Sequence, residues 1–157
     1  MRASVGVIFL AMVSVCGTRT GNAQGFRFQY VAKFVCGTPT PRDTSRFQIV
    51  VQRYATVINV YSPTDTAQIW KKLALGYPEG NERPGALIPF ATDTLLPGHA
   101  FAIDCRDVAT KAKQRPGSFF DGFVIILSSG PLDVVGIYTV PGGIDVADAK
   151  EYAIKLQ

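Results

Sequence analysis

The amino-acid sequence predicts an all-β domain, an antiparallel β-sandwich of about seven strands. Three observations support this fold class. The chain is rich in valine, isoleucine, phenylalanine, tyrosine and threonine, which favour strands. Apolar and polar residues alternate over several short segments, as they do in strands with one buried face. Proline and glycine recur between these segments about every ten residues, a spacing typical of sandwiches.

The first expected strand, residues 26–36, shows the alternation most clearly. Phe28, Phe34 and Cys36 share one face, whereas Lys33 lies on the other. A period of two with one apolar side indicates a half-buried antiparallel strand. The sequence therefore places Cys36 on the core side of its strand.

Six further segments have the composition and length of strands. Residues 119–128 are apolar on both faces, so we expect them to form a central strand. Residues 38–46 and 76–85 are rich in proline, glycine and polar residues and are expected to be loops. The six segments are residues 47–62 (firmest over 54–61), 68–75, 86–91, 99–103, 119–128 and 132–140.

Two segments favour helix. Asp104 and Asp107 stand three residues apart, as in a capping box, and predict one or two helical turns over residues 105–112. The last segment, residues 144–157, has acidic residues early and lysines late, which suits a helix dipole. We expect this segment to be either a C-terminal helix docked on the domain or a flexible tail.

The first 23 residues have the organisation of a secretory signal peptide. Arg2 gives a positive start, and residues 3–17 form an apolar run of about 15 residues, shorter than the ~20 that span a bilayer. Small residues at 21–23 predict cleavage before Gln24. We therefore expect a periplasmic or extracellular (secreted) protein with no stable membrane span after cleavage.

The expected organisation is a signal peptide over residues 1–23, a sandwich domain over 24–143 and the terminal segment over 144–157. Loss of the leader removes two arginines and no acid, so the formal net charge falls from +4 to about +2. So weak a positive charge argues against binding to nucleic acid, which needs clustered lysine and arginine.

The cysteines are expected to form a disulfide between Cys36 and Cys105. Cys16 leaves with the signal peptide, and Val15 before it fits a lipid-anchor motif poorly. The two remaining cysteines share the parity of core residues, and an exported protein permits disulfides. The bond would close a loop of about 70 residues, worth roughly 4 kcal/mol in the chain-entropy model. Two buried free thiols, or a reactive Cys105 paired with His99, are the alternatives.

Catalytic chemistry finds little support in the sequence. His99 lies about 20 Å from Cys105 if the strand between them is extended. Asp104, Asp121 and Asp133 flank apolar strands, but nothing in the sequence brings them together for acid–base work. The nucleophile-elbow, phosphate-loop and dinucleotide motifs do not occur. We therefore expect a protein that is not an enzyme and has no cofactor.

The remaining polar residues favour structural roles. One histidine and a single cysteine pair make a metal site improbable on composition. Loop aspartates are expected to cap turns rather than collect calcium. A small basic patch near residues 119–120 is expected to be a solvated loop, although it could touch an anionic polymer. The loop aspartates are Asp43, Asp65 and Asp93, and the basic patch comprises Lys111, Lys113 and Arg115.

Three aromatic residues are candidates for ligand binding: Tyr61, Trp70 and Tyr77. Trp70 lies opposite the apolar parity of its strand, which favours exposure. Exposed aromatic rings on a sandwich can stack on sugars or anchor a partner. The alternative is that the three rings pack in a second apolar layer or under a loop.

Five sequence blocks resemble a family of small, uncharacterised bacterial and archaeal proteins, and this resemblance implies no catalytic residue. The chain is also similar, in strand order and in an apolar hairpin near the end, to sensory-rhodopsin transducer-like sandwiches. That likeness implies a fold that binds small ligands and partners. The five blocks are Tyr30–Gly37, Thr56–Pro63, His99–Asp107, Asp121–Ile126 and Leu132–Thr139.

Taken together, the sequence predicts an exported, non-catalytic β-sandwich that acts as a structural or protein-interaction module of the cell envelope or extracellular space. Its expected partners are another protein or a second copy of the chain. The alternative is a protein that binds carbohydrate or another small ligand through the three aromatic residues. A small hydrolase is the third hypothesis, and it needs an aspartate pair or the Cys105–His99 pair to meet.

Overall fold

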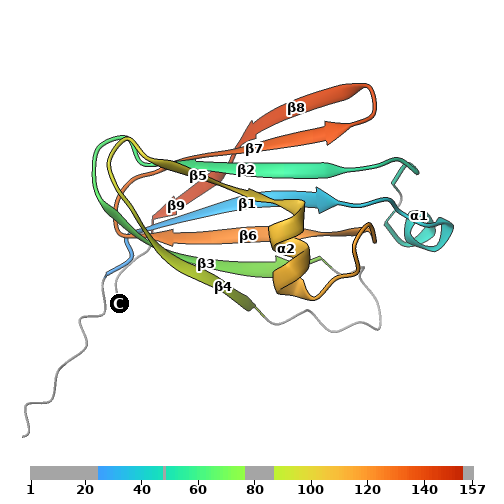
Figure 1. The fold of residues 1–157 in the computed structure, drawn as a ribbon, viewed down its shortest axis with the longest axis horizontal. Coiled ribbons are helices and arrows are strands. Elements are labelled where there is room, and N and C mark those ends of the chain that lie inside the picture. The colour runs from blue at the N-terminus through green and yellow to red at the C-terminus, as the bar shows by residue number, and fades with distance from the viewer. Residues whose placement is uncertain (1–24, 48, 77–86, 154–157) are drawn as a thin grey trace, which may run out of the picture.

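The computed structural model describes residues 25–47, 49–76 and 87–153. Within these residues the chain forms two antiparallel β-sheets packed as a sandwich, with two short helices (Figure 1). The predicted all-β sandwich is therefore confirmed. Residues 1–23, the expected signal peptide, lie outside the described residues. No helix in the described part of the chain is long and apolar enough to cross a membrane.

One sheet has five strands in the order β4-β3-β6-β1-β9, and the other has four in the order β5-β2-β7-β8. The seven strands expected from the sequence correspond to β1–β7. The elements are β1 (Phe28–Cys36), α1 (Pro41–Phe47), β2 (Ala55–Tyr61), β3 (Ala67–Leu75), β4 (Ile88–Leu95), β5 (Ala100–Asp104), α2 (Cys105–Ala112), β6 (Phe120–Ser128), β7 (Asp133–Val140), β8 (Gly143–Asp148) and β9 (Lys150–Ala153).

Strand β6 is the centre of the five-stranded sheet, as its apolar faces predict. It pairs with β1 on one side and with β3 on the other. Its inward residues Val124 and Ile126 are fully buried against inward residues of β1 such as Phe34. Tyr30, also inward on β1, accepts a hydrogen bond of 2.8 Å from the backbone N–H of Leu132, which links the sheet to the start of β7.

Helix α2 confirms the prediction for residues 105–112. The Asp104 carboxylate accepts hydrogen bonds from the backbone N–H groups of Arg106 and Asp107, and Asp107 accepts one from the N–H of Asp104. This reciprocal pairing satisfies amides that have no partner within the helix. Val108 is buried and packs the helix against the core.

The loop expected over residues 38–46 contains a helix, so that prediction was wrong in part. Asp43 accepts a hydrogen bond from the backbone N–H of Thr40, and the Thr40 hydroxyl accepts one from the N–H of Asp43. Pro41 stands at the first helical position, where its missing N–H costs nothing. The helix is only seven residues long and has a polar, proline-containing sequence, a composition that is also typical of loops.

The C-terminal segment forms strands, and neither the helix nor the flexible tail predicted for it is found over residues 144–153. Pro141 and Gly142 make a tight turn, with Gly142 at φ +92°, that brings Gly143 opposite Val140. Ile144 and Val146 then alternate with polar or small residues at the period of a strand. The acidic residues early and lysines late in the segment would suit a helix dipole, but the tight turn and the β-branched Ile144 and Val146 favour a strand.

The same segment joins the edges of the two sheets. Strand β8 pairs with β7 at one edge of the four-stranded sheet, and β9 pairs with β1 at one edge of the five-stranded sheet. Only Ala149 separates them, and its N–H donates to the carbonyl of Val134. Figure 1 shows the β7–β8 hairpin and the return of the chain to β9 beside β1.

Candidate functional site

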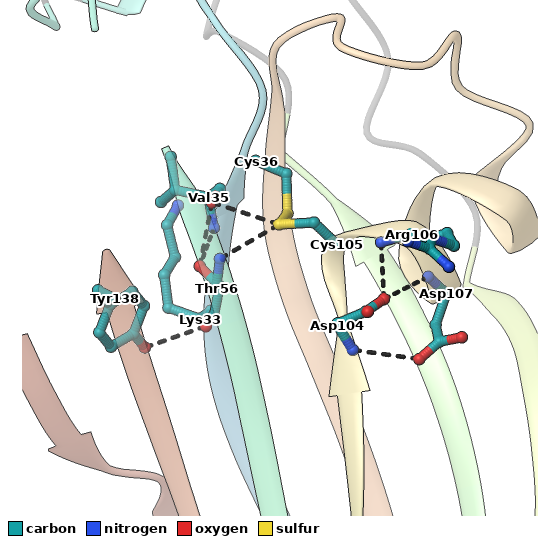
Figure 2. The surroundings of a disulfide bond; sticks show 9 residues. All are labelled: Lys33, Val35, Cys36, Thr56, Asp104, Cys105, Arg106, Asp107 and Tyr138. Atoms are coloured by element: carbon teal, nitrogen blue, oxygen red, sulfur yellow. Dashed lines mark hydrogen bonds between the residues drawn. A yellow bond between two sulfur atoms is a disulfide. The ribbon is translucent and has the colours of Figure 1, made fainter. Parts of the chain in front are cut away.

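The two cysteines form the predicted disulfide. Cys36 is the last residue of β1 and Cys105 the first residue of α2, and their Cα atoms are 5.7 Å apart. The bond therefore links the five-stranded sheet to the helix that follows the four-stranded sheet (Figure 2). Because its sulfur is bonded, Cys105 has no free thiol, and the alternatives of buried thiols and of a reactive thiol are wrong for this structure.

Thr56 connects the two sheets beside the disulfide. Its hydroxyl accepts a 3.0 Å hydrogen bond from the N–H of Val35 and donates one of 3.0 Å to the carbonyl of the same residue. Its backbone N–H points to the sulfur of Cys105 at 3.2 Å (Figure 2). A buried hydroxyl thus satisfies backbone groups of the opposite sheet, as a buried polar group must.

An open groove of about 740 Å³ lies beside the disulfide. Its walls come from the end of β1, the start of β2, helix α2 and residues 114–120. Arg53 and Arg106 line it, and neither forms an ion pair within the described residues. Tyr54 contributes a ring and Thr110 a hydroxyl. The groove offers two guanidinium groups, which suits an anionic ligand, and the Asp104 carboxylate on its wall is engaged by amides of α2.

The residues proposed for hydrolysis are not brought together. Asp104 lies beside Val57 and caps α2, whereas Asp133 stands at the other end of the same sheet beside Tyr61. Asp121 belongs to the five-stranded sheet, where it pairs with Lys33. His99 is exposed and its Nδ1 lies 3.0 Å from the carbonyl of Pro97. In the described part of the chain no three acidic, histidine or cysteine side chains gather as metal ligands would.

Loop aspartates and the basic patch have varied surroundings. Asp43 caps α1 as expected. Asp65 lies in the turn after β2, where its backbone carbonyl accepts a hydrogen bond from the Ser62 hydroxyl. Asp93 lies within β4 and pairs with Lys71. The prediction that Asp93 is a loop residue was therefore wrong. In the basic patch, the Lys111 ammonium lies 5.8 Å from the centre of the Phe90 ring.

Lys71 is a buried cation in the core, and the sequence analysis did not single it out. Its side chain is 8% exposed and faces inward from β3, on the side of Ile69 and Leu73. The ammonium lies 4.4 Å from the centre of the Phe101 ring and forms an ion pair with Asp93. The alternation of the strand could have revealed the burial of Lys71, because Lys71 lies on the same side as Ile69 and Leu73 and opposite to Trp70.

The aromatic ligand-binding candidates do not form one site. Tyr61 faces outward from the four-stranded sheet and is 40% exposed. Trp70 faces outward from the five-stranded sheet, where it contacts Phe26 and Lys72. The two rings therefore lie on opposite outer faces of the sandwich. Tyr77 lies outside the described residues.

The outer face of the four-stranded sheet is apolar and uncovered. Ile144 is 71% exposed and Val146 is 61% exposed. Alanines 100 and 102 of β5 extend the surface, and among its described residues no lysine or arginine occurs. Asp104, Asp133 and Asp148 stand at its margins. We call this surface the apolar face, centred on Val57, Tyr61, Val135, Ile137, Ile144 and Val146.

The outer face of the five-stranded sheet has a different character, since its lysines rest on aromatic rings. The Lys72 ammonium lies 3.9 Å from the centre of the Trp70 ring, and that of Lys33 lies 5.0 Å from the Phe123 ring. Such contacts hold a cation close to an apolar surface. We call this surface the lysine face, defined by Lys33, Trp70, Lys72, Phe123, Lys150 and Tyr152.

Comparison with known proteins adds little to these observations. No family model matches the chain, and no curated protein sequence matches it. Among solved structures, the crystal structure of Thermotoga maritima 1070 is weakly similar, with 8% identity and a TM-score of 0.44. The match covers 80% of this chain and 94% of that chain. We draw no functional conclusion from it.

Proposed function

We propose that this protein is a non-catalytic protein-interaction module and that the apolar face is its contact surface. The observation that carries the proposal is the exposure of Ile144 and Val146 beside an outward row of apolar residues on β7 and β2. The whole outer surface of the four-stranded sheet, with Asn59, Thr139 and the marginal acids included, covers about 400 Å² in projection, from four strands ~4.8 Å apart and ~20 Å along β2. Exposed apolar residues gathered on such a surface often mark a binding site.

The charges of the face define the partner that fits it. Asp133 and Asp148 are exposed at its margin and form no ion pair within the described residues. A partner with an apolar centre and lysine or arginine around it would bury the valines and pair with these carboxylates. Complementary charge of this kind favours encounter and excludes partners with acidic margins.

The proposal includes export to the periplasm or the extracellular space. The leader at residues 1–23 supports it, and so does the disulfide, because such bonds persist in oxidising compartments. The resemblance to sensory-rhodopsin transducer-like sandwiches, which implies binding of small ligands and partners, supports the proposed role in interaction. Mass analysis of the protein from its source cells tests export, since the mature chain should begin at Gln24. Recovery of the intact leader in a cytoplasmic fraction would contradict it.

A photo-crosslinking residue placed at position 146 tests the contact surface. Position 51 is the matched control, because Val51 is also a valine, is 60% exposed and lies outside both faces. We expect one dominant adduct of fixed mass from position 146 in source cells and none from position 51. The bound surface should carry lysine or arginine around an apolar centre.

The outcomes separate the proposal from its alternatives. Equal adducts from both positions indicate nonspecific contact and contradict the proposal, as does the absence of any adduct from position 146. An adduct with twice the mass of the chain identifies a second copy as the partner. An adduct of another mass identifies a different protein, whose surface chemistry then decides whether the expected charge pattern holds.

A second candidate function is the binding of a small anionic ligand in the groove beside the disulfide. Arg53 and Arg106 on its walls favour it. The sequence predicts a sugar site formed by three aromatic residues. Tyr61 and Trp70 do not support such a site, because they lie apart on different sheets. Calorimetry with a panel of sugar acids and dicarboxylates is the test, with Arg53→Ala expected to weaken binding at least tenfold and Arg115→Ala as the control.

A further inference from the structure

We infer that the partner of the apolar face is the lysine face of a second copy of this chain. The inference rests on the proposed function, because it names the partner of the same surface. Both faces belong to one molecule and lie on opposite sides of the sandwich. Contact between them would therefore repeat from copy to copy.

The strand registers define the pattern of the apolar face. One row across the sheet runs Asp104–Val57–Ile137–Val146, and the next runs Ala102–Asn59–Val135–Asp148. Val57, Ile137 and Val135 occupy the middle of these rows together with the polar Asn59, and each row has an acid at one end. Asp133 lies in the next row, beside Tyr61. The Asp104 carboxylate is already engaged by the amides of α2, so Asp133 and Asp148 are the acids free to pair.

The lysine face carries charges of the opposite sign, and its two lysines are spaced more widely than Asp133 and Asp148, which lie on the neighbouring strands β7 and β8. One row runs Lys72–Ile125–Val31–Lys150 across four strands, so its two lysines start about 14 Å apart. The neighbouring row runs Trp70–Leu127–Gln29–Tyr152. Apolar residues and Gln29 occupy the middle of these rows, and the first row has at its ends two cations without an ion pair in the described residues.

Charge decides which faces meet. Two apolar faces in contact would bring together the carboxylates of both copies, and two lysine faces would bring together their ammonium groups. An apolar face on a lysine face instead offers two free acids to two free lysines, while Lys33 keeps its own acid, Asp121. It also covers Phe123 and Tyr152, which are 41% and 42% exposed, together with Ile144 and Val146. The faces of two β-sheets pack as layers about 10 Å apart.

The geometry of such contact is head to back. Each copy uses one face as donor and the other as acceptor, so the interface is heterologous and leaves a free face at each end. The structure therefore points to a stack of sandwiches that grows with protein concentration. Screening by salt should weaken it, because the pairing charges lie at the margins.

Two complementary variants test this arrangement. One carries Ile144→Asp and Val146→Asp, which blocks the apolar face, and the other carries Lys72→Glu and Lys150→Glu, which blocks the lysine face. Val50→Asp with Val51→Asp, and Lys111→Glu with Lys113→Glu, are the matched controls at exposed sites outside the faces. Sedimentation of the disulfide-bonded mature chain measures association, and circular dichroism checks the fold of each variant.

We expect the wild type and the controls to gain mass with concentration, while each blocked variant remains a monomer. An equimolar mixture of the two blocked variants should form one 1:1 complex and nothing larger. A further variant, Asp133→Lys with Asp148→Lys, should remain a monomer alone and associate with Lys72→Glu/Lys150→Glu, which keeps the test valid if the first variant unfolds.

Three results would overturn the inference. Dimers of the lysine-face variant alone would show that two apolar faces meet. No complex in the mixture would show that the faces do not bind each other. Monomeric wild type up to millimolar concentration would exclude a second copy, whereas the adduct at position 146 would then still reveal a different partner. The inference and the proposed function can thus fail separately.

Discussion

Lys71 shows how a charged side chain is accommodated inside this sandwich. Its stem is packed among core residues of β3, and its ammonium lies against the ring of Phe101 and pairs with Asp93. The acid is 46% exposed, so water reaches one side of the pair. A buried cation is costly unless it is paired and close to polarisable groups. Loss of Asp93 should therefore destabilise the protein more than replacement of Lys71 by an apolar residue.

Substitution of the two members of this pair should have unequal effects. Lys71→Met keeps the volume of the side chain and should change the free energy of unfolding by less than ~1 kcal/mol. Asp93→Ala leaves a buried cation without its acid and should cost about 1–3 kcal/mol, reduced from the full buried-pair value because Asp93 is half exposed. Urea denaturation of both variants measures the difference. Equal losses would contradict this account.

Tyr30 should make stability fall at alkaline pH. Burial raises the pKa of Tyr30 above its ordinary value of about 10, and nearby Glu151 adds to the shift, although the hydrogen bond from Leu132 lowers it. The folded state then holds the proton more tightly than the unfolded state. The stabilisation is complete below pH ~10 and is lost as the pH rises through the folded value.

Melting temperatures between pH 8 and 11 measure this effect. Tyr30→Phe should be less stable at pH 8 by about 1 kcal/mol, because the N–H of Leu132 loses its acceptor, and its further loss above pH 10 should be smaller than in the wild type. Burial also raises the pKa of Tyr138, so some alkaline loss should remain. Tyr61→Phe, at an exposed ring, is the control. Identical slopes for wild type and Tyr30→Phe would exclude Tyr30 as the cause.

At the scale of elements, β6 is the strand on which the five-stranded sheet depends. It pairs over its length with β1 and β3, and Gly122 lies opposite Phe34 on one side and Leu75 on the other. Gly122 has φ +157°, and a Cβ there would lie 2.1 Å from the carbonyl oxygen of Ala74 and 2.9 Å from the Phe34 ring. A backbone oxygen cannot move aside as a flexible side chain can. The strand therefore needs glycine at this position.

Gly122→Ala should lower the free energy of unfolding by 3 kcal/mol or more, or prevent folding, since it overpacks a buried site against backbone (roughly 1–3 kcal/mol, plus strain). Gly130→Ala is the control, because its nearest neighbours would lie 3.7 Å from the new Cβ. It should stay within about 0.5 kcal/mol of the wild type. Chemical denaturation compares the two, and a Gly122→Ala protein of normal stability would refute the steric argument.

Elements with clear periodicity could be predicted, and those formed by local turns could not. The alternation in residues 26–36 and the apolar faces of 119–128 correctly indicated β1 and the central β6. Helix α1 was missed because a capped helix of seven residues is too short for an apolar period to reveal it. Strands β8 and β9 were missed because their residues are exposed, so no buried face marks their period.

The candidate site was foreseen in part. The inward parity of Cys36 and Cys105 indicated their bond, which the structure confirms. The apolar face was hidden, because an outward apolar row on β7 looks like a second buried face until the sheet is known to be uncovered there. Lys71 and its acid come from different strands, and sequence shows no such pairing. The sequence therefore predicts which side of a strand a residue faces, but not which residues of different strands contact each other.

At the scale of the whole molecule, the disulfide and the C-terminal crossing tie the two layers together at separate places. The bond joins β1 to α2, and Ala149 connects β8 to β9. The sheets are also linked by side chains of the core and by hydrogen bonds of Thr56, Tyr30 and Tyr138. Two opposite outer faces remain, one apolar with acids and one with lysines, and this polarity is what suits the molecule to stacking.

Removal of the disulfide should be the largest single loss of stability outside the core. Cys36→Ala with Cys105→Ala opens a loop with a sequence separation of 69 residues, which corresponds to about 4 kcal/mol in the chain-entropy model. The variant should unfold at a lower urea concentration, and the wild type should lose a similar amount on reduction. A thiol titration of the mature protein should find no free thiol before reduction and two after it. A loss below ~1 kcal/mol would show that the unfolded state is already restricted.

The short crossing at Ala149 also makes the last strand replaceable. Lys150 is exposed, so a trypsin nick after it would leave Lys150 joined to β8 and hold residues 151–153 only by their ladder to β1. Dissociation of that short peptide would uncover the backbone donors and acceptors along one border of β1, and an extended segment of another chain could then bind there. A single proteolytic cut at this point would thus convert a paired sheet edge into an exposed edge strand to which another chain can add a strand.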